Sequence, residues 1–247
     1  APAATPVAPN TPAISSPIFI DRIHTPFSNT REKKAIIGIS LPTPIDSAYT
    51  GHSRNDMGKN VVESVSFTAM KDGTRADYVL LDLYEREHVA TLGDRILGAL
   101  ERLSGGLGGY QIDRLQHSLQ SATRAENDGA DEEWIVAALI HDIGDDLAPM
   151  NHSEFAAALI KPYVREEVHW VVAHHGLFQM AYYAHHLGQD PNGRNRYRDH
   201  PFFESCLRFC ERWDQPSFDP AYPTRPLAHF APRLQRVFSR QAFTESV

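Results

Sequence analysis

The sequence predicts an all-α protein, a bundle of about eight helices preceded by an irregular N-terminal arm. From residue 77 onward, apolar residues recur at spacings of three and four, which is the period of an amphipathic helix. Patterns typical of β-strands are almost absent after residue 72. A chain of 247 residues, 42% of them hydrophobic, is also long enough to bury a core without metal or disulfide cross-links.

The irregular arm is predicted over residues 1–72, and the helical domain over residues 73–247. Proline and glycine interrupt the arm repeatedly, and Ala, Pro, Thr and Ser dominate residues 1–17. We expect this first stretch to be disordered, because such a composition offers little apolar surface to bury. It also lacks the basic start and the long apolar centre of a secretion signal.

Breakers and caps set the bounds of the predicted helices. The first helix ends before Gly105, and the second is closed by Gly129. Asp131 is a predicted N-cap for the third, and a capping box from Asn151 to Glu154 should start the fourth. The expected ranges are 77–103, 112–128, 132–142, 151–161, 164–173, 178–187, 202–213 and 226–238. The apolar face of the first comprises Tyr78, Leu81, Tyr84, His88, Leu92, Ile96, Leu100 and Leu103.

Composition disfavours several classes of function. Lys and Arg number 24 against 31 Asp and Glu, a net charge of -7, so the basic excess that favours nucleic-acid binding is missing. No apolar run reaches the roughly 18 residues of a membrane-spanning helix. The two cysteines, Cys206 and Cys210, cannot form a disulfide framework and indicate a reducing, cytoplasmic setting. We therefore expect a small-molecule substrate as the partner, with no nucleic acid and no membrane, and the oligomeric state stays open.

Thirteen histidines are the unusual feature of the composition. His141 and Asp142 adjoin at the end of an apolar helix, where polar side chains are costly to bury without compensation. A metal ion is one such compensation, since imidazole and carboxylate are good ligands and a carboxylate can bridge two cations. Alone, the dipeptide would more often cap a helix. Further candidates beside the core or at predicted helix ends are His117, His152, His174, His175 and Asp214.

The order of these residues resembles the HD-domain superfamily, whose metal signature is a His, an HD dipeptide and a later Asp. Three strings carry the likeness: LQHSLQSA around His117, ALIHDIG at 138–144, and WD at 213–214. More narrowly, the pattern is similar to that of the mixed-valent diiron oxygenases, the group that contains myo-inositol oxygenase and the hydroxyphosphonate-cleaving oxygenases. The likeness covers about residues 107–240 and implies an HD-type helical bundle.

The narrower resemblance implies a pair of iron ions, Fe(II) and Fe(III), with dioxygen as co-substrate. His117, His141 and Asp214 would bind one iron, His152 and His174 would bind the other, and Asp142 would bridge them. Asp142 and His174 would then be catalytic. His175 adjoins His174 and could supply the ligand in its place.

The sequence departs from that group around the expected substrate site. Asp145 and Asp146 follow the HD dipeptide, where many members have a Lys or His that holds an anionic or polyol substrate. Leu107 and Tyr110 stand where the hydroxyphosphonate oxygenases have Tyr and Glu, and Phe178 replaces their phosphonate-binding Lys. An acidic rim beside aromatic residues would suit a substrate with a cationic group. The predicted substrate-binding residues are Tyr110, Asp145, Asp146, His175, Phe178 and Tyr182.

The leading hypothesis is a diiron oxygenase that oxidises or cleaves a small hydroxylated substrate. The alternative is a metal-dependent phosphohydrolase acting on a nucleotide or other phosphate ester, the commoner activity of the superfamily. Asp145 in place of a Lys disfavours the hydrolase, because an acidic group repels phosphate. A binding module that retains the metal residues only as core is a third reading.

Overall fold

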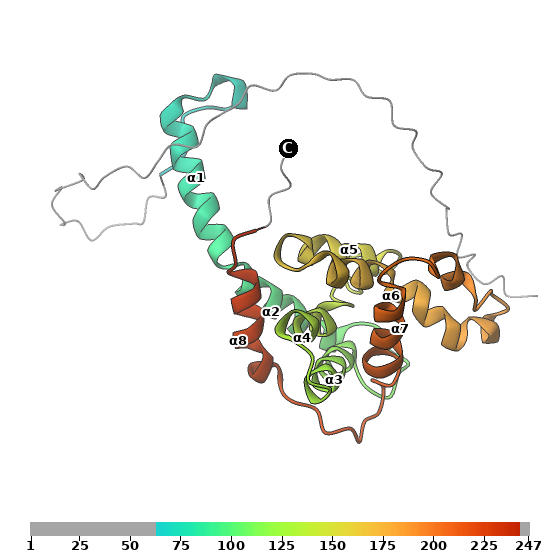
Figure 1. Cartoon of the computed structure of the whole chain (residues 1–247). Helices are drawn as coiled ribbons and strands as arrows, with labels where there is room; N and C mark the ends of the chain where they lie inside the picture. Colours follow the sequence, from blue (N-terminus) through green and yellow to red (C-terminus); the bar gives the residue numbers. More distant parts are fainter. Residues whose placement is uncertain (1–62, 243–247) are drawn as a thin grey trace, which may run out of the picture. The chain divides into compact units, whose positions relative to one another are not determined.

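The computed structural model describes residues 63–242, and within this range the chain forms α-helices, short 3-10 turns and no β-strand (Figure 1). The predicted all-α fold is therefore confirmed. The arm expected over 1–72 lies outside the described residues except for its last ten positions. The helices are α1 Arg75–Ala90, α2 Leu92–Arg102, α3 Arg114–Asn127, α4 Glu132–Ile140, α5 His152–Ile160, α6 Glu166–Tyr183, α7 Phe203–Phe209 and α8 Leu227–Phe238.

The long first helix is divided at Thr91, where the backbone leaves the helical region (φ -97°, ψ 12°). The apolar stripe predicted along it is consequently buried only in its second half. Ile96 and Leu100 in α2 belong to the core, whereas Tyr78 and Tyr84 in α1 are 40% and 37% exposed. The interruption at Thr91 means that the two halves do not present one continuous face.

Two other predicted boundaries are wrong. The helices expected over 164–173 and 178–187 are one helix, α6, which runs through His174, His175 and Gly176 without a break. The helix expected over 202–213 is α7 followed by a π-helix, Cys210–Asp214. A glycine inside a helix costs only about 1 kcal/mol relative to alanine, so packing against neighbouring helices can override it.

Of the two predicted N-caps, the one at Asp131 is confirmed and the capping box at Asn151 is wrong. Asp131 caps α4 as expected, since its side chain accepts a hydrogen bond from the Trp134 amide at 3.1 Å. Asn151 does occupy the N-cap of α5, but its side chain accepts no capping hydrogen bond, so the predicted capping box is wrong. Its backbone (φ -146°, ψ 36°) is not the extended conformation in which a side-chain oxygen reaches the first turn.

Helix α4 lies at the centre of the core, and all seven residues from Trp134 to Ile140 are buried. It packs against α3, α6 and α8, while α5 packs against α6. Arg236 of α8 and Arg240, two residues after its end, bond to Glu132 at the start of α4, which fixes the C-terminal helix to the bundle. Because α4 is buried along its whole length, its last turn delivers His141 and Asp142 to the interior.

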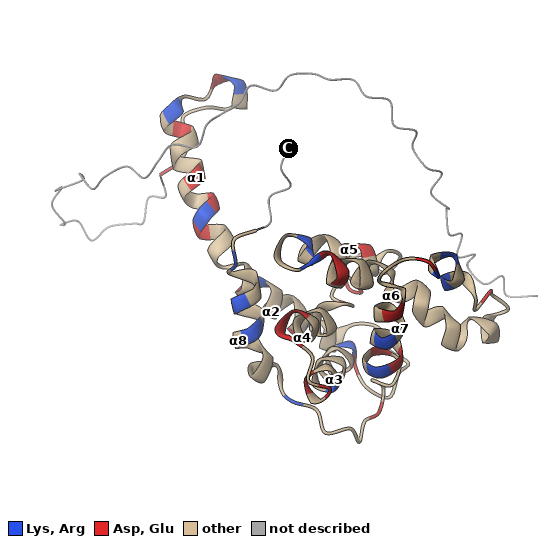
Figure 2. Ribbon diagram, in the orientation of Figure 1, with Lys and Arg blue, Asp and Glu red and all other residues tan. Residues whose placement is uncertain are grey.

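Helix α1 carries charges of both signs, with four acidic residues and two arginines along its length (Figure 2). Among the described residues, no helix has the length and hydropathy needed to cross a bilayer.

Candidate metal centre

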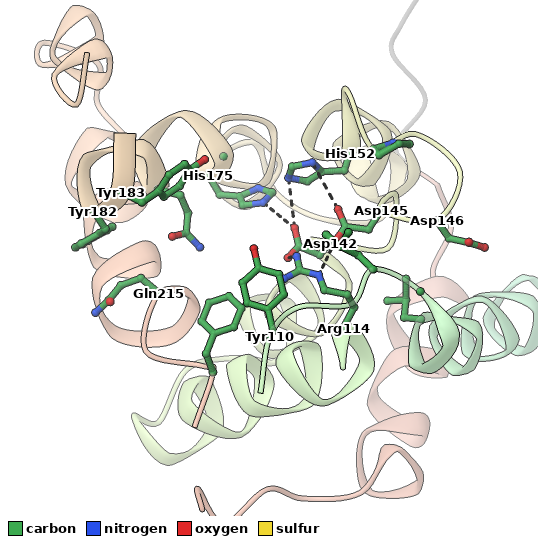
Figure 3. Close-up of a pocket in the computed structure, with 17 residues that line it drawn as sticks. Tyr110, Arg114, Asp142, Asp145, Asp146, His152, His175, Tyr182, Tyr183 and Gln215 are labelled. Atoms are coloured by element: carbon green, nitrogen blue, oxygen red, sulfur yellow. Dashed lines mark hydrogen bonds and ion pairs between the residues drawn. The ribbon is translucent and has the colours of Figure 1, made fainter. Parts of the chain in front are cut away.

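A cavity of about 810 Å³ opens beside the end of α4, between α3, α5, α6 and the segment after the π-helix (Figure 3). Five predicted substrate-binding residues line it: Tyr110, Asp145, Asp146, His175 and Tyr182. His175, Gln179 and Tyr182 follow one another at helical spacing along the face of α6 that borders the cavity.

Phe178 does not line this cavity, contrary to the prediction. Its side chain is fully buried and packs against Phe203 and Trp170, with ring centroids 5.2 Å and 5.9 Å away. Because α6 is continuous, Phe178 is turned about 100° from Gln179 and faces the core.

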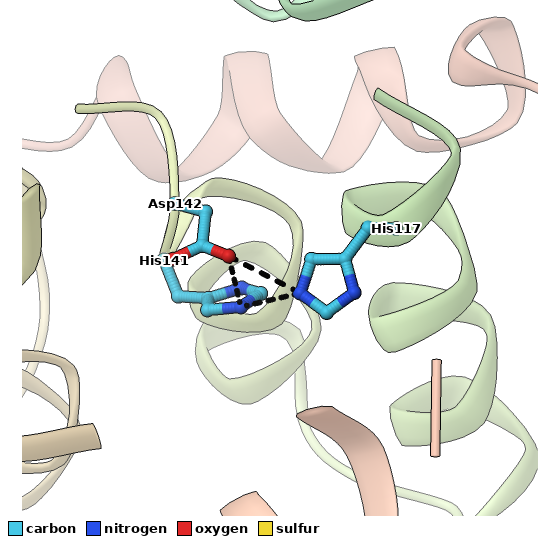
Figure 4. A group of neighbouring side chains, drawn as sticks. All are labelled: His117, His141 and Asp142. Carbon is cyan, nitrogen blue, oxygen red and sulfur yellow. Dashed lines mark hydrogen bonds and ion pairs between the residues drawn. The ribbon is translucent and has the colours of Figure 1, made fainter. Parts of the chain in front are cut away.

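The first group of donors lies directly below the cavity and joins α3, the end of α4 and the π-helix. The Nε2 atoms of His117 and His141 are 3.1 Å apart, and each lies 3.2 Å from Oδ2 of Asp142 (Figure 4). Oδ1 of Asp214 completes the group at 3.3 Å and 3.4 Å from the same two nitrogens.

These separations match the coordination shell of one metal ion. Bonds of about 2.0–2.2 Å, at the angles of octahedral or tetrahedral geometry, place neighbouring donors about 2.8–3.6 Å apart. The four donors are thus spaced as ligands of a single cation.

A second group of donors shares Asp142 with the first. Oδ1 of Asp142 lies 3.2 Å from Nε2 of His175 and 3.4 Å from Nε2 of His152. The two oxygens of this carboxylate therefore face different histidine pairs, as a ligand bridging two cations would. His141, His175 and Asp214 also offer ligand atoms within 4.8 Å of one another, so the two groups are contiguous.

The ring nitrogens that point away from the cluster are held by backbone carbonyls. Nδ1 of His117 donates to Ser217 O at 2.9 Å, Nδ1 of His141 to Ala138 O at 2.9 Å, and Nδ1 of His175 to Val172 O at 2.7 Å. A carbonyl can only accept, so in each neutral ring the lone pair sits on Nε2, facing the cluster.

His174 lies outside this cluster, and the structure corrects its predicted role as ligand. Its ring stacks on Trp170, with centroids 4.1 Å apart, and Nδ1 donates to the Trp170 carbonyl at 2.7 Å. Neighbouring residues on a helix point about 100° apart, so only one of the doubled histidines can reach the cluster. That residue is His175, the alternative that the sequence had left open.

The π-helix explains how Asp214 reaches the first group. The extra residue that a π-turn accommodates rotates the following side chains relative to a regular helix, and such turns often occur at functional sites. Asp214 is fully buried, and neither of its carboxylate oxygens accepts a hydrogen bond from the described residues. A buried carboxylate without hydrogen bonds is costly unless a cation accompanies it, so the residues present fit a metal ion.

Gly144, the last residue of the HDIG string, allows α5 to approach the cluster. A Cβ at this position would lie 2.8 Å from Cα and 2.9 Å from the carbonyl oxygen of His152. Only glycine therefore fits where the turn after α4 touches the start of α5.

Electrostatics in the metal-free protein reflect the same crowding. Burial alone would lower the pKa of His141, but Asp142 and Asp214 beside it raise that pKa well above its ordinary value. Burial likewise tends to raise the pKa of Asp142, whereas His141 and Arg114 hold it well below its usual range. The cluster therefore favours positive charge, whether protons or a cation supply it.

Arg114 is a site residue that the sequence reasoning missed. It is buried beside the cavity, donates to Oδ2 of Asp142 through Nη2, and donates from Nε to Oδ2 of Asp145 at 2.6 Å. Asp145 is consequently neutralised, so Asp146 is the exposed acidic residue of the predicted rim. Arg114 stands one helical turn before His117, and that spacing was the available signal.

The chain carries a known domain where this cluster is built. Residues 114–208 match the model of the HD domain family. This HD domain includes Arg114, His117, the HD dipeptide, His152 and His175, while Asp214 lies just beyond the matched range. No curated protein matches the chain. The broader resemblance is confirmed, and the oxygenase group within the superfamily stays a proposal.

Proposed function

We propose that this protein is an HD-domain oxygenase that holds a pair of iron ions and oxidises or cleaves a small hydroxylated substrate with dioxygen. The match to the HD domain and the buried cluster of His and Asp together indicate a metal-dependent enzyme. The choice of iron and dioxygen rests on the donor set and on the resemblance to the mixed-valent diiron group.

The position of Asp142 carries the proposal. Each of its two oxygens lies within 3.4 Å of a different pair of histidine nitrogens, so it can bridge two cations. Four imidazoles and two carboxylates form a set that suits iron or manganese and contributes little negative charge. An iron pair bound there would supply the one-electron chemistry and the dioxygen binding that an oxygenase needs.

The protein's own residues would position the substrate and restrict water. His175 and His152 face the cavity from α6 and α5, so a substrate in the cavity lies directly against the second group of donors. Tyr110 and Phe218 stack on one another with centroids 5.0 Å apart, and Phe218 also stacks on the ring of His117 at 4.4 Å. These rings shield the first group from the cavity side.

A metal-dependent phosphohydrolase is the second candidate, and the Arg114 to Asp145 ion pair favours keeping it. Asp145 disfavours phosphate only if it is unpaired, and here a guanidinium neutralises it. A pair of cations that activates water would use the same donors.

Metal analysis combined with two activity assays separates these functions. We expect about two irons per chain, an electron paramagnetic resonance signal of a coupled mixed-valent pair after partial reduction, and substrate-dependent dioxygen consumption. Zinc or manganese with turnover of a phosphomonoester would support the hydrolase instead. The matched variants are Asp142→Ala, which should lose bound metal, and Asp190→Ala, an exposed loop aspartate that bonds only the Asn192 amide and should retain it. Full metal content in Asp142→Ala would contradict both functions.

A further inference from the structure

We propose that Arg114 binds an oxyanion group of the substrate, and that Asp145 is the residue that holds Arg114 in place for this purpose. The inference rests on the proposed two-metal centre. It assigns a substrate-binding role to a residue from α3, on the opposite side of the cavity from α6 (Figure 3).

Arg114 contacts two carboxylates, one that belongs to the metal donors and one that does not. Nη2 donates to Oδ2 of Asp142, the same oxygen that lies 3.2 Å from the Nε2 atoms of His117 and His141. Nε donates to Asp145, which belongs to neither group of metal donors. Nη1 makes no hydrogen bond to any of the described residues. Arg114 is thus held from one side, with nitrogen donors left for a further acceptor.

A cation in the first group would compete with Arg114 for Oδ2 of Asp142. The metal ion would take the lone pair toward the histidines and would repel the guanidinium. The bond to Asp145 is independent of that oxygen, so it would keep Arg114 at the cavity wall. The Tyr110 and Phe218 rings, 5.5 Å and 6.0 Å from the guanidinium carbon, limit where it can turn. The released nitrogens would then face the cavity.

Local charge favours an anion once the metals are bound. Asp142, Asp145 and Asp214 carry three negative charges against the single positive charge of Arg114. An Fe(II) and Fe(III) pair would change this net charge from minus two to plus three, and the exposed Asp146 offsets only one unit. This charge balance favours an anionic substrate. The sequence had indicated a cationic one because the carboxylates were counted without Arg114 and without the metal ions.

The geometry of the group selects an oxyanion. A guanidinium presents parallel N–H donors that match the two oxygens of a carboxylate, phosphonate or phosphate, and such paired bonds are strong in a buried site. Because Arg114 also lies beside Asp142, the oxyanion would be bound within reach of the metal centre. The other end of the substrate would lie toward Tyr182 and Tyr183 of α6.

Binding measurements on the metal-loaded full chain test this assignment without depending on turnover. Isothermal titration would compare acetate, methylphosphonate and inorganic phosphate, with tetramethylammonium as the cationic probe. We expect Arg114→Gln to weaken the best oxyanion at least about tenfold, with unchanged metal content. Arg225→Gln, which removes an arginine paired with Glu126 away from the cavity, should change the same affinity by less than about twofold. The oxyanion with the largest loss in Arg114→Gln identifies the group.

Several results would overturn the inference. If Arg114→Gln retains both metals and wild-type oxyanion affinity, Arg114 has no such role, although the metal centre stands. Tighter binding of tetramethylammonium than of every oxyanion would also reject it. If metal titration shows no binding to the wild type, the proposed function and the inference both fail. Should Arg114→Gln not fold, Arg114→Lys decides: wild-type affinity there would exclude the paired guanidinium bonds, and a loss would support them.

Discussion

The doubled histidine on α6 offers a sharp test, because two adjacent and chemically identical residues are assigned different roles. His175 points into the cluster, 3.2 Å from Asp142, whereas His174 stacks on Trp170. Structural metal sites with four ligands are worth about 10–16 kcal/mol, or about 3 kcal/mol for each ligand. At about 1.4 kcal/mol per tenfold, His175→Ala should weaken the second metal position at least about a hundredfold. Metal content should then fall from about two ions to about one per chain.

His174→Ala should behave differently. It removes a ring stacked at 4.1 Å on Trp170 and a hydrogen bond to the Trp170 carbonyl. Loss of such an aromatic pair costs about 0.5–1.5 kcal/mol, which for a unit of this size lowers the melting temperature by about 1–6 °C. Its metal content should remain that of the wild type.

Metal analysis after dialysis, titration of the metal-free protein and thermal melts distinguish these outcomes. The same substitution at adjacent positions controls for composition and for disturbance of α6. Loss of an ion in His174→Ala, with both ions retained in His175→Ala, would show that the assigned orientation of α6 is wrong.

Three further predictions concern the groups around the cluster. Asp214→Asn should weaken the first metal position at least about a hundredfold in metal titrations, because the substitution removes an anionic oxygen that lies 3.3 Å and 3.4 Å from the two histidine nitrogens of that position. Gly144→Ala should destabilise the protein by about 1–3 kcal/mol in chemical denaturation and weaken the metal position that uses His152, since the added Cβ meets the His152 backbone. The raised pKa values of His117 and His141 stabilise the metal-free protein below their unfolded pKa, and this stability is lost as pH rises through the folded values. Melting temperature in chelator should therefore fall as the pH rises above the ordinary histidine value of about 6.5, whereas the metal-loaded protein should show no such decline.

Local signals were sufficient for much of the fold and for most of the cluster. Helical periodicity and the Asp131 cap predicted the α4 region, and five of the six predicted ligand candidates do meet. They were recognisable because imidazole and carboxylate groups beside buried apolar segments are costly to bury unless a partner such as a metal ion compensates them. Local sequence signals could not decide whether His174 or His175 is the ligand. The answer depends on whether α6 continues through Gly176, which packing against α5 decides.

The role of Asp145 could not be read from its neighbours in the chain. Next to Asp146 it looks like part of an acidic rim, but its partner, Arg114, precedes it by 31 residues. A charged residue has a defined effect only once its partner is known, and that partner is fixed by how α3 packs against the turn after α4. The i−3 spacing of Arg114 from His117 indicated a shared face, although not which carboxylate would be met.

The arrangement of Arg114 also implies that metal binding and oxyanion binding are coupled. In the metal-free protein, protons on His117 and His141 and the guanidinium together balance the buried carboxylates. A cation that displaces Arg114 from Asp142 makes its nitrogens available, so an oxyanion should bind more tightly to the loaded protein. Linkage is reciprocal, and the same oxyanion must then tighten the metal by an equal factor. The turn that follows α4 thus connects the two events, since it carries both Asp142, which exchanges its partner, and Asp145, which does not.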